Sequence, residues 1–234
     1  MNILVTGASK GLGLQICDSL LSKGWSVYGI SRTSNKNLKS LLEKYPNNMH
    51  WFKCDLLDIN SLKKDLYDDF LKNIQFDGFV NNAAFAYDDI ITNLNIERLE
   101  SMFRVNVISP MLLTKFLLRN FILYRNKGSI VHVSSISVHT GYKGLSMYAS
   151  TKGSLEAFSK NCAREWGSFG IRSNCVVAGF METEMSSKIS KEQKDRIYKR
   201  TSTKKPVSIK SVSETISFLL SKRSSSITGQ NIFV

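Results

Sequence analysis

Short apolar runs alternate along this chain with longer segments whose apolar residues recur every three or four positions. The short runs predict β-strands, and the longer segments predict amphipathic helices. The predicted strands lie at residues 2–6, 25–30, 49–54, 76–84, 128–134, 171–177 and 230–234. The predicted helices lie at residues 14–24, 37–45, 61–74, 96–124, 147–167 and 212–222.

This alternation continues from end to end without a linker, a low-complexity tract or a break in composition. Strands that alternate with helices predict an α/β fold, in which a parallel, doubly wound sheet carries helices on both faces. With 234 residues, of which 42% are hydrophobic, the chain can bury one sizeable core. We therefore expect a single domain over residues 1–234.

Charge and cysteine usage narrow the class of function. The formal net charge of +13 can indicate nucleic acid, a membrane surface or an anionic small ligand. Neither a recognised nucleic-acid motif nor a run of 18 apolar residues accompanies it, so we expect no nucleic-acid or membrane partner. The four cysteines and three histidines are scattered, and the start MNILVTGASKG lacks a signal-peptide pattern. We expect no metal centre, and a cytoplasmic protein with reduced thiols.

A glycine-rich turn follows the first predicted strand and opens the first predicted helix. Its glycines, in TGASKGLG, carry no side chain that could block a bound phosphate. The helix start adds free N–H groups and the positive end of the helix dipole, so this context predicts a dinucleotide pyrophosphate site. The residues expected there are Gly7, Ser9, Lys10, Gly11, Leu12 and Gly13.

The second predicted strand leads into Ser31, Arg32 and Thr33. An NAD-binding unit usually has an acidic residue here for the ribose 2′-hydroxyl, but residues 19–42 contain none. Arg32 and Lys10 can instead meet a 2′-phosphate. We therefore expect NADP(H) rather than NAD(H) as the cofactor.

Further cofactor contacts are expected at the carboxyl ends of the third and fourth strands, where open α/β sheets bind ligands. Asp55 and Leu56 follow the third strand and would border an adenine. Small or polar residues end the fourth, at Asn82, Ala83 and Ala84.

Pro110 lies inside the long helix predicted at residues 96–124. Proline has no N–H, so the carbonyl of Asn106, four residues earlier, loses its helical partner. The residues allow a simple kink at this point, or a water site held by the freed carbonyl.

The candidate catalytic groups are Ser135, after the fifth strand, and Tyr148 and Lys152, four residues apart in a predicted helix. That spacing places the phenol and the amine on one helical face. A cation about 4 Å from a phenol is worth about 4 kcal/mol at an effective dielectric of ~20, or roughly three pKa units. Such a shift would bring the pKa of Tyr148 into the range useful for general acid–base catalysis.

Taken in order, these motifs resemble the short-chain dehydrogenase/reductase family over nearly the whole chain. The segments GASKGLG, VAGFMETEM and ITGQNIFV are similar to its 3-oxoacyl-[acyl-carrier-protein] reductase branch. The resemblance implies a single-domain Rossmann-type fold and NADPH-dependent reduction of a ketone, above all a 3-oxoacyl thioester. A sugar, polyol or secondary-metabolite ketone is the alternative substrate. A non-catalytic nucleotide sensor is disfavoured, because it would not need the intact set of catalytic residues.

The resemblance also implies roles for individual residues. Ser135 would hold the substrate carbonyl oxygen, and Tyr148 would donate the proton to it. Lys152 would lower the tyrosine pKa and bind the nicotinamide ribose, while Asn106 would bind the water that resupplies the proton. Met181 and Thr183 would border the nicotinamide carboxamide, and Gly179 would also contact the cofactor. The family further implies a homo-oligomer, either a dimer or a tetramer.

Two features depart from the family pattern. Ala178 and Gly179 replace its usual Pro-Gly pair, which makes that turn less rigid. The chain also stops at Val234, before the Asp-Gly-Gly-type tail often seen, and this would weaken an oligomer contact.

A basic stretch at about residues 184–205 would cover the substrate cleft in this family. Helical spacing places Lys188, Lys191 and Lys194 along one side of it. The stretch is either a solvated lid or a docking strip for an acidic acyl carrier protein or a phosphorylated substrate.

Overall fold

The computed structural model describes residues 1–187 and 189–234. Within these residues seven strands form one parallel sheet in the order β3-β2-β1-β4-β5-β6-β7. The strands are β1 (Asn2–Thr6), β2 (Ser26–Ser31), β3 (Met49–Lys53), β4 (Gly78–Asn81), β5 (Ser129–Ser135), β6 (Arg172–Ala178) and β7 (Asn231–Phe233). The predicted doubly wound parallel sheet is therefore confirmed, and every strand overlaps a predicted one.

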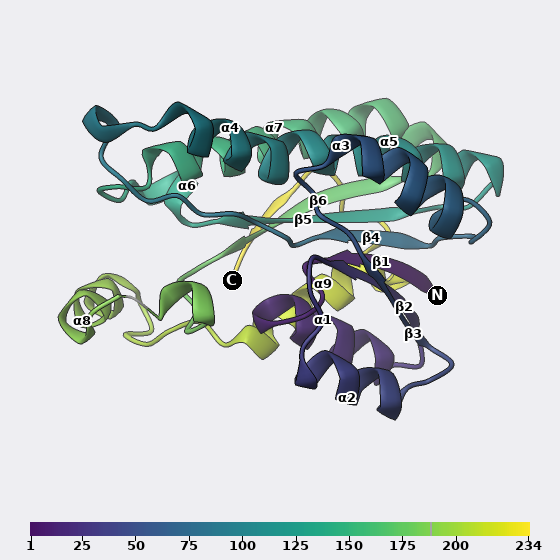
Figure 1. Ribbon diagram of the computed structural model, residues 1–234, viewed down its shortest axis with the longest axis horizontal. Helices are drawn as coiled ribbons and strands as arrows, with labels where there is room; N and C mark the ends of the chain where they lie inside the picture. The colour runs from purple at the N-terminus through teal and green to yellow at the C-terminus, as the bar shows by residue number, and fades with distance from the viewer. Residues whose placement is uncertain (188) are drawn as a thin grey trace.

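Helices cover both faces of the sheet (Figure 1). One face carries α1 (Gly11–Leu21), α2 (Lys36–Lys44) and α9 (Ile209–Leu220). The opposite face carries α3 (Ile59–Ser61) with the π-helical η1 (Leu62–Leu71), α4 (Ile96–Phe103), α5 (Ser109–Leu123), α6 (Ser137–Thr140) and α7 (Ser146–Trp166). The strand order reverses between β1 and β4, and open sheets bind ligands in the crevice that such a reversal leaves at the carboxyl ends.

The alternation of side chains along β1 divides the core between the two faces. Ile3 and Val5 belong to the cluster under α1 and α9, whereas Leu4 belongs to the cluster under η1 and α5. All three are fully buried, as a strand covered on both faces requires.

The helical stretch Ile96–Leu123 is 28 residues long and apolar enough to cross a membrane. It is a core helix of this fold, because Leu113, Leu117 and Phe121 are at most 1% exposed and pack against the sheet. The residues just before Pro110 form π-helical turns, η3 (Arg104–Ile108).

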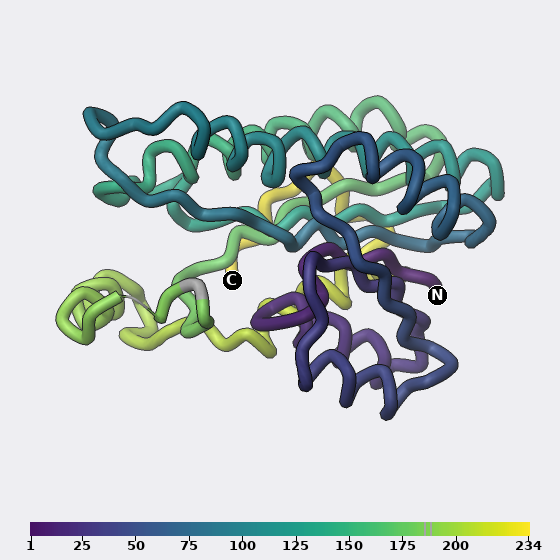
Figure 2. Tube along the Cα trace, viewed as in Figure 1, coloured from purple at the N-terminus to yellow at the C-terminus, as the bar shows by residue number. Residues whose placement is uncertain are grey.

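The segment between β6 and α9 extends past the carboxyl edge of the sheet (Figure 2). It contains η5 (Glu184–Ser186) and α8 (Lys191–Arg200), within the region expected to cover a substrate. Lys188, a member of the expected basic strip, lies outside the described residues.

Candidate active site

The glycine loop between β1 and α1 depends on two glycines that admit no side chain. Gly7 has a φ of 71°, and a Cβ there would lie 2.9 Å from Nδ2 of Asn82. At Gly13 a Cβ would lie 2.0 Å from the carbonyl oxygen of Gly7. Among the described residues, no side chain caps the start of α1. The loop and the helix start therefore fit the phosphates of a dinucleotide.

The end of β4 is hydrogen-bonded to the end of β1, directly before this loop. The Thr6 hydroxyl accepts from the backbone N–H groups of Asn82 and Ala83, both at 2.9 Å. The Asn82 side chain donates to the carbonyl of Thr6 at 2.9 Å. These bonds join β1 and β4 at the point where the strand order reverses, and Ala84 follows half-buried.

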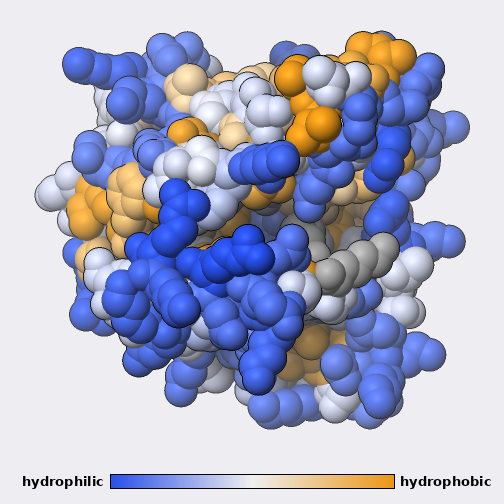
Figure 3. Space-filling model, turned by 90° about the vertical axis from the view of Figure 1, so that its left-hand side faces the viewer, coloured by the Kyte–Doolittle hydropathy of each residue, from blue (hydrophilic) through white to orange (hydrophobic). Residues whose placement is uncertain are grey.

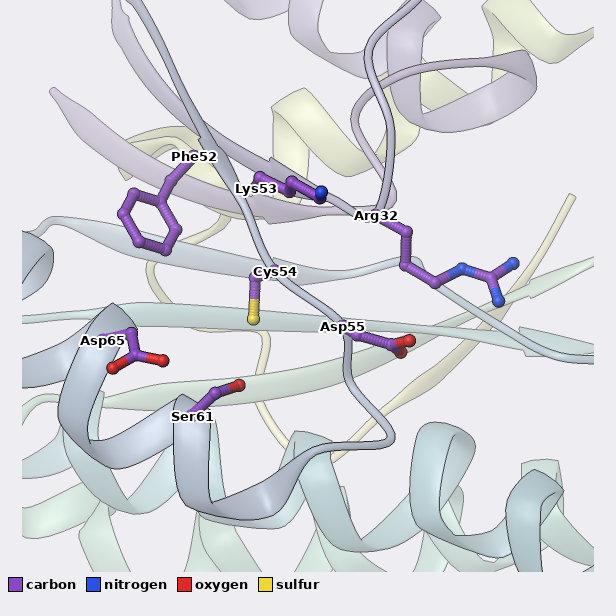
Figure 4. A pocket seen from close by; sticks show the side chains of 7 residues that line it. All are labelled: Arg32, Phe52, Lys53, Cys54, Asp55, Ser61 and Asp65. Carbon is purple, nitrogen blue, oxygen red and sulfur yellow. The ribbon is translucent and has the colours of Figure 1, made fainter.

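The residues expected to select the cofactor lie at the carboxyl ends of β2 and β3. The Ser31 hydroxyl donates to the carbonyl of Thr33 at 3.0 Å, while the Arg32 side chain is exposed. Arg32 and Asp55 lie at one end of a pocket of about 310 Å³ (Figure 4). The rest of the pocket is lined by Phe52, Lys53, Cys54, Ser61 and Asp65. Leu56, expected beside the adenine, is buried.

Lys10 forms an ion pair with Glu184 at 2.9 Å, across from the glycine loop to η5. Its ammonium was expected to assist Arg32 at a 2′-phosphate. In this structure the Lys10 ammonium pairs with the Glu184 carboxylate instead. Both side chains are more than 60% exposed, so water weakens the pair and a bound phosphate can compete for the lysine.

The three candidate catalytic residues lie on two elements that pack together, β5 and α7. Ser135 ends that strand, and its hydroxyl bonds the Ser137 hydroxyl at 2.9 Å. Tyr148 and Lys152 lie on α7, and the Lys152 ammonium is 5.7 Å from the centroid of the Tyr148 ring. Lys152 is 2% exposed and donates to the carbonyl of Val133 at 2.8 Å.

Asn106 is fully buried in the π-helical turns. Its side chain bonds both the N–H and the carbonyl of Phe85 at 2.8 Å, and it donates to the Thr151 hydroxyl at 3.0 Å. It thus joins the loop after β4 to α7, beside Lys152. The water site at its carbonyl stays a prediction.

The electrostatics of Tyr148 differ from the expectation. Burial raises its pKa, and the nearby Asp88 carboxylate raises it further. The pKa of Tyr148 therefore shifts in the direction opposite to the expected one, and the Lys152 ammonium donates to the carbonyl of Val133. Burial also lowers the pKa of Lys152 itself to about 8. The phenol stays protonated at neutral pH, which is the form that can donate a proton.

The remaining residues expected to contact the cofactor follow β6. The N–H of Gly179 donates to the carbonyl of Val234 at 2.9 Å. Thr183 caps η5 by a reciprocal bond with Ser186, and Met181 packs beside the core cluster under α1. They lie in the chain directly after Ala178, which pairs with Ser135 in the sheet.

Two acidic residues near the site were missed by the sequence reasoning. The Asp88 carboxylate contributes to the raised pKa of Tyr148. Glu156 lies eight residues after Tyr148 on α7, and its spacing of four from Lys152 was the signal available in the sequence.

The family model described as enoyl-(acyl carrier protein) reductase matches residues 7–234. The chain belongs to the short-chain dehydrogenase/reductase family and is an oxidoreductase. It is 32% identical to 3-oxoacyl-[acyl-carrier-protein] reductase FabG of Aquifex aeolicus, over 99% of this chain and 94% of that protein. It is 30% identical to L-xylulose reductase of Caenorhabditis elegans, over 98% of this chain and 92% of that protein. A solved structure, ElxO with NADP bound, is 26% identical with a TM-score of 0.90, over 100% of this chain and 96% of that one.

Proposed function

We propose that this chain is an NADPH-dependent ketone reductase and that its substrate is a 3-oxoacyl thioester. The observation that carries the proposal is that Lys152 lies beside the Tyr148 ring on α7 and bonds the carbonyl of Val133, two residues before Ser135 on β5. The glycine loop beside β4 supports a dinucleotide. The similarity to FabG of Aquifex aeolicus supports the substrate class, and the NADP held by ElxO supports the cofactor.

When bound, the cofactor supplies a hydride to the carbonyl carbon of the substrate. As the new C–H bond forms, the π bond of the carbonyl breaks and its electron pair stays on oxygen as a negative charge. Ser135 donates a hydrogen bond to that oxygen, and Tyr148 transfers its phenolic proton to it, so that the product is a secondary alcohol. The Lys152 ammonium, 5.7 Å from the centroid of the Tyr148 ring, would stabilise the charge of the phenolate that remains.

The direct test is a substrate panel followed at the absorbance of NADPH. It contains a 3-oxoacyl thioester, an enoyl thioester, L-xylulose and a simple ketone. We expect the 3-oxoacyl thioester to give the highest kcat/KM. If L-xylulose gives the highest kcat/KM, the proposed 3-oxoacyl thioester is the wrong substrate, but the reaction is still reduction of a ketone. If only the enoyl thioester is turned over, the proposed ketone reduction is contradicted.

Arg32 is expected to decide between the two nicotinamide cofactors. A charge-assisted contact to a 2′-phosphate is worth about 1.5–3 kcal/mol, so NADPH should exceed NADH by at least ~10-fold in kcat/KM. Arg32→Asp should narrow or reverse that ratio. Lys39→Asp makes the same charge change on the exposed side of α2 and should leave the ratio alone. Equal use of both cofactors by the wild type would refute the assignment.

The positive charge of α8 supports the proposal that the substrate is bound to an acidic carrier protein. Figure 3 shows hydrophilic side chains gathered over the lower half of this face, where α8 lies. The expected strip needs revision, because Lys194 is only 25% exposed and pairs with Glu182 at 3.5 Å. The cations of α8 that remain exposed are Lys191, Arg196, Lys199 and Arg200.

Attraction between this surface and an acyl carrier protein should fade with salt, because the Debye length falls from ~10 Å at 0.1 M to ~3 Å at 1 M. We expect KM for a carrier-linked substrate to rise with salt and in an Arg196→Glu/Lys199→Glu variant. A small neutral ketone should respond to neither. Lys63→Glu/Lys64→Glu reverses two exposed cations on η1 and serves as the control. Equal salt profiles for both substrates would leave α8 without a docking role.

A further inference from the structure

A buried carboxylate lies one helical turn beyond Lys152. Glu156, on α7, is 7% exposed. Among the described residues, its oxygens accept hydrogen bonds from Ser134 Oγ, from His139 Nε2 at 3.0 Å and from Asn231 Nδ2 at 2.7 Å. These donors belong to β5, α6 and β7, so Glu156 joins three elements to the helix that carries Tyr148 and Lys152.

Residues one helical turn apart on α7 bond neighbouring residues of β5. Tyr148, Lys152 and Glu156 are four residues apart, which places them on one face of the helix. Lys152 bonds the carbonyl of Val133, and Glu156 bonds the side chain of Ser134. The helix is therefore fastened to the two residues that immediately precede Ser135.

The chain that leaves Ser135 is fastened to the same carboxylate. His139 lies four residues after Ser135, in α6, and its ring bonds Glu156. Between them, Ser137 bonds the Ser135 hydroxyl through its own hydroxyl at 2.9 Å and its N–H at 3.2 Å. Glu156 thus holds both flanks of Ser135.

The chemistry of the carboxylate makes this arrangement specific. A carboxylate accepts hydrogen bonds, and Ser134 Oγ, Asn231 Nδ2 and His139, in the tautomer with its proton on Nε2, all donate to it. A buried charge that loses its donors is strongly unfavourable. Moving β5 or α6 away from α7 would leave Glu156 unsatisfied, so the bonds select one position for Ser135 relative to Tyr148.

We propose that Glu156 is a positioning residue for the reaction: it fixes Ser135 against Tyr148 and Lys152 without touching the substrate. The proposal rests on the proposed carbonyl reduction. Misplacement of a catalytic group by about 1 Å can cost ~100-fold in rate. Loss of the carboxylate should therefore lower kcat far more than it weakens cofactor binding.

The first experiment compares Glu156→Ala and Glu156→Gln with Ser159→Ala. Ser159 lies on the same helix and bonds Ser173 at 2.8 Å in the core, so its loss reports a purely structural defect. We expect Glu156→Ala to lower kcat at least ~10-fold, with KM for NADPH changed less than ~3-fold. Glu156→Gln keeps the shape and part of the bonding, and it should recover much of kcat. Ser159→Ala should lower the melting temperature and keep kcat.

Two single-partner variants protect the test if Glu156→Ala does not fold. Ser134→Ala and His139→Ala each release one flank of Ser135, and both should lower kcat. Asn231→Ala releases only β7 and should act mainly on stability. Unchanged kcat in both flank variants, or equal kcat losses in Glu156→Ala and Ser159→Ala, would overturn the positioning role.

A second readout does not depend on turnover. Hydrogen exchange of residues 134–139 should quicken in Glu156→Ala and stay slow in Ser159→Ala. A wild type that reduces none of the carbonyl substrates would refute the proposed function, while this exchange pattern would still report whether Glu156 holds the segment. If the enzyme is active and hydrogen exchange of residues 134–139 is the same in Glu156→Ala as in the wild type, Glu156 does not position this segment.

Discussion

Replacing Tyr148 by phenylalanine is expected to lower kcat at least ~100-fold and to leave folding and NADPH affinity nearly unchanged. General acid catalysis by a positioned group contributes about 10²–10⁴-fold. Phenylalanine keeps the ring and removes only the proton that would reach the carbonyl oxygen. Because burial and Asp88 raise the pKa of Tyr148, the wild-type phenol carries that proton throughout the neutral range.

The measurement combines steady-state kinetics with NADPH titration by fluorescence and a thermal melt. Tyr142→Phe is the matched control, since Tyr142 is a half-buried tyrosine in the chain between Ser135 and α7. It should keep kcat within a few-fold. If Tyr148→Phe retains more than about a tenth of the wild-type kcat, Tyr148 is not the proton donor.

Lys152→Met should abolish turnover and should also change how stability depends on pH. Burial lowers the pKa of Lys152 from 10.5 to about 8. Between these two values the unfolded chain holds a proton that the folded chain has released. Stability of the wild type relative to the variant should therefore rise with pH over this window, by about 1.4 kcal/mol per unit and up to ~3 kcal/mol.

Denaturant unfolding of both proteins at pH 7, 8, 9 and 10 would check this second expectation. The difference between the two removes contributions from groups that they share, such as the buried thiols of Cys17 and Cys54. Lys160→Met, at an exposed position on the same helix, should show a constant difference from the wild type. A constant difference for Lys152→Met as well would mean that burial does not perturb this amine.

Most of the fold was predictable because its signals are local. The runs at Ile3–Val5 and Ile130–Val133 are buried on both faces of the sheet, and such strands form continuous apolar sequences. The glycine loop was predictable for a similar reason, since Gly7 and Gly13 lie where a side chain would collide with nearby atoms. Tyr148 and Lys152 share a helical face whatever surrounds them.

The parts that could not be predicted depend on residues far apart in the chain. Glu156 meets Asn231, 75 residues later, and nothing in its own helix indicates that contact. The pKa of Tyr148 depends on burial and on Asp88 in a distant loop, so the spacing to Lys152 alone gave the wrong direction. Lys10 was placed at the cofactor without knowledge of Glu184, which pairs with it.

The packing of α1 against α9 has a consequence for the synthesis of this protein. Ser19 and Ser213 hydrogen-bond at 2.9 Å across a separation of 194 residues, and the apolar faces of their helices share one cluster. A ribosome that adds about 5–20 residues per second needs roughly 10–40 s to cover that distance. During that time the apolar face of α1 is outside the ribosome without its partner, and the cofactor loop that precedes it rests on an unfinished core. The nascent chain is then open to aggregation or to capture by a chaperone, and this vulnerability ends only when α9 emerges.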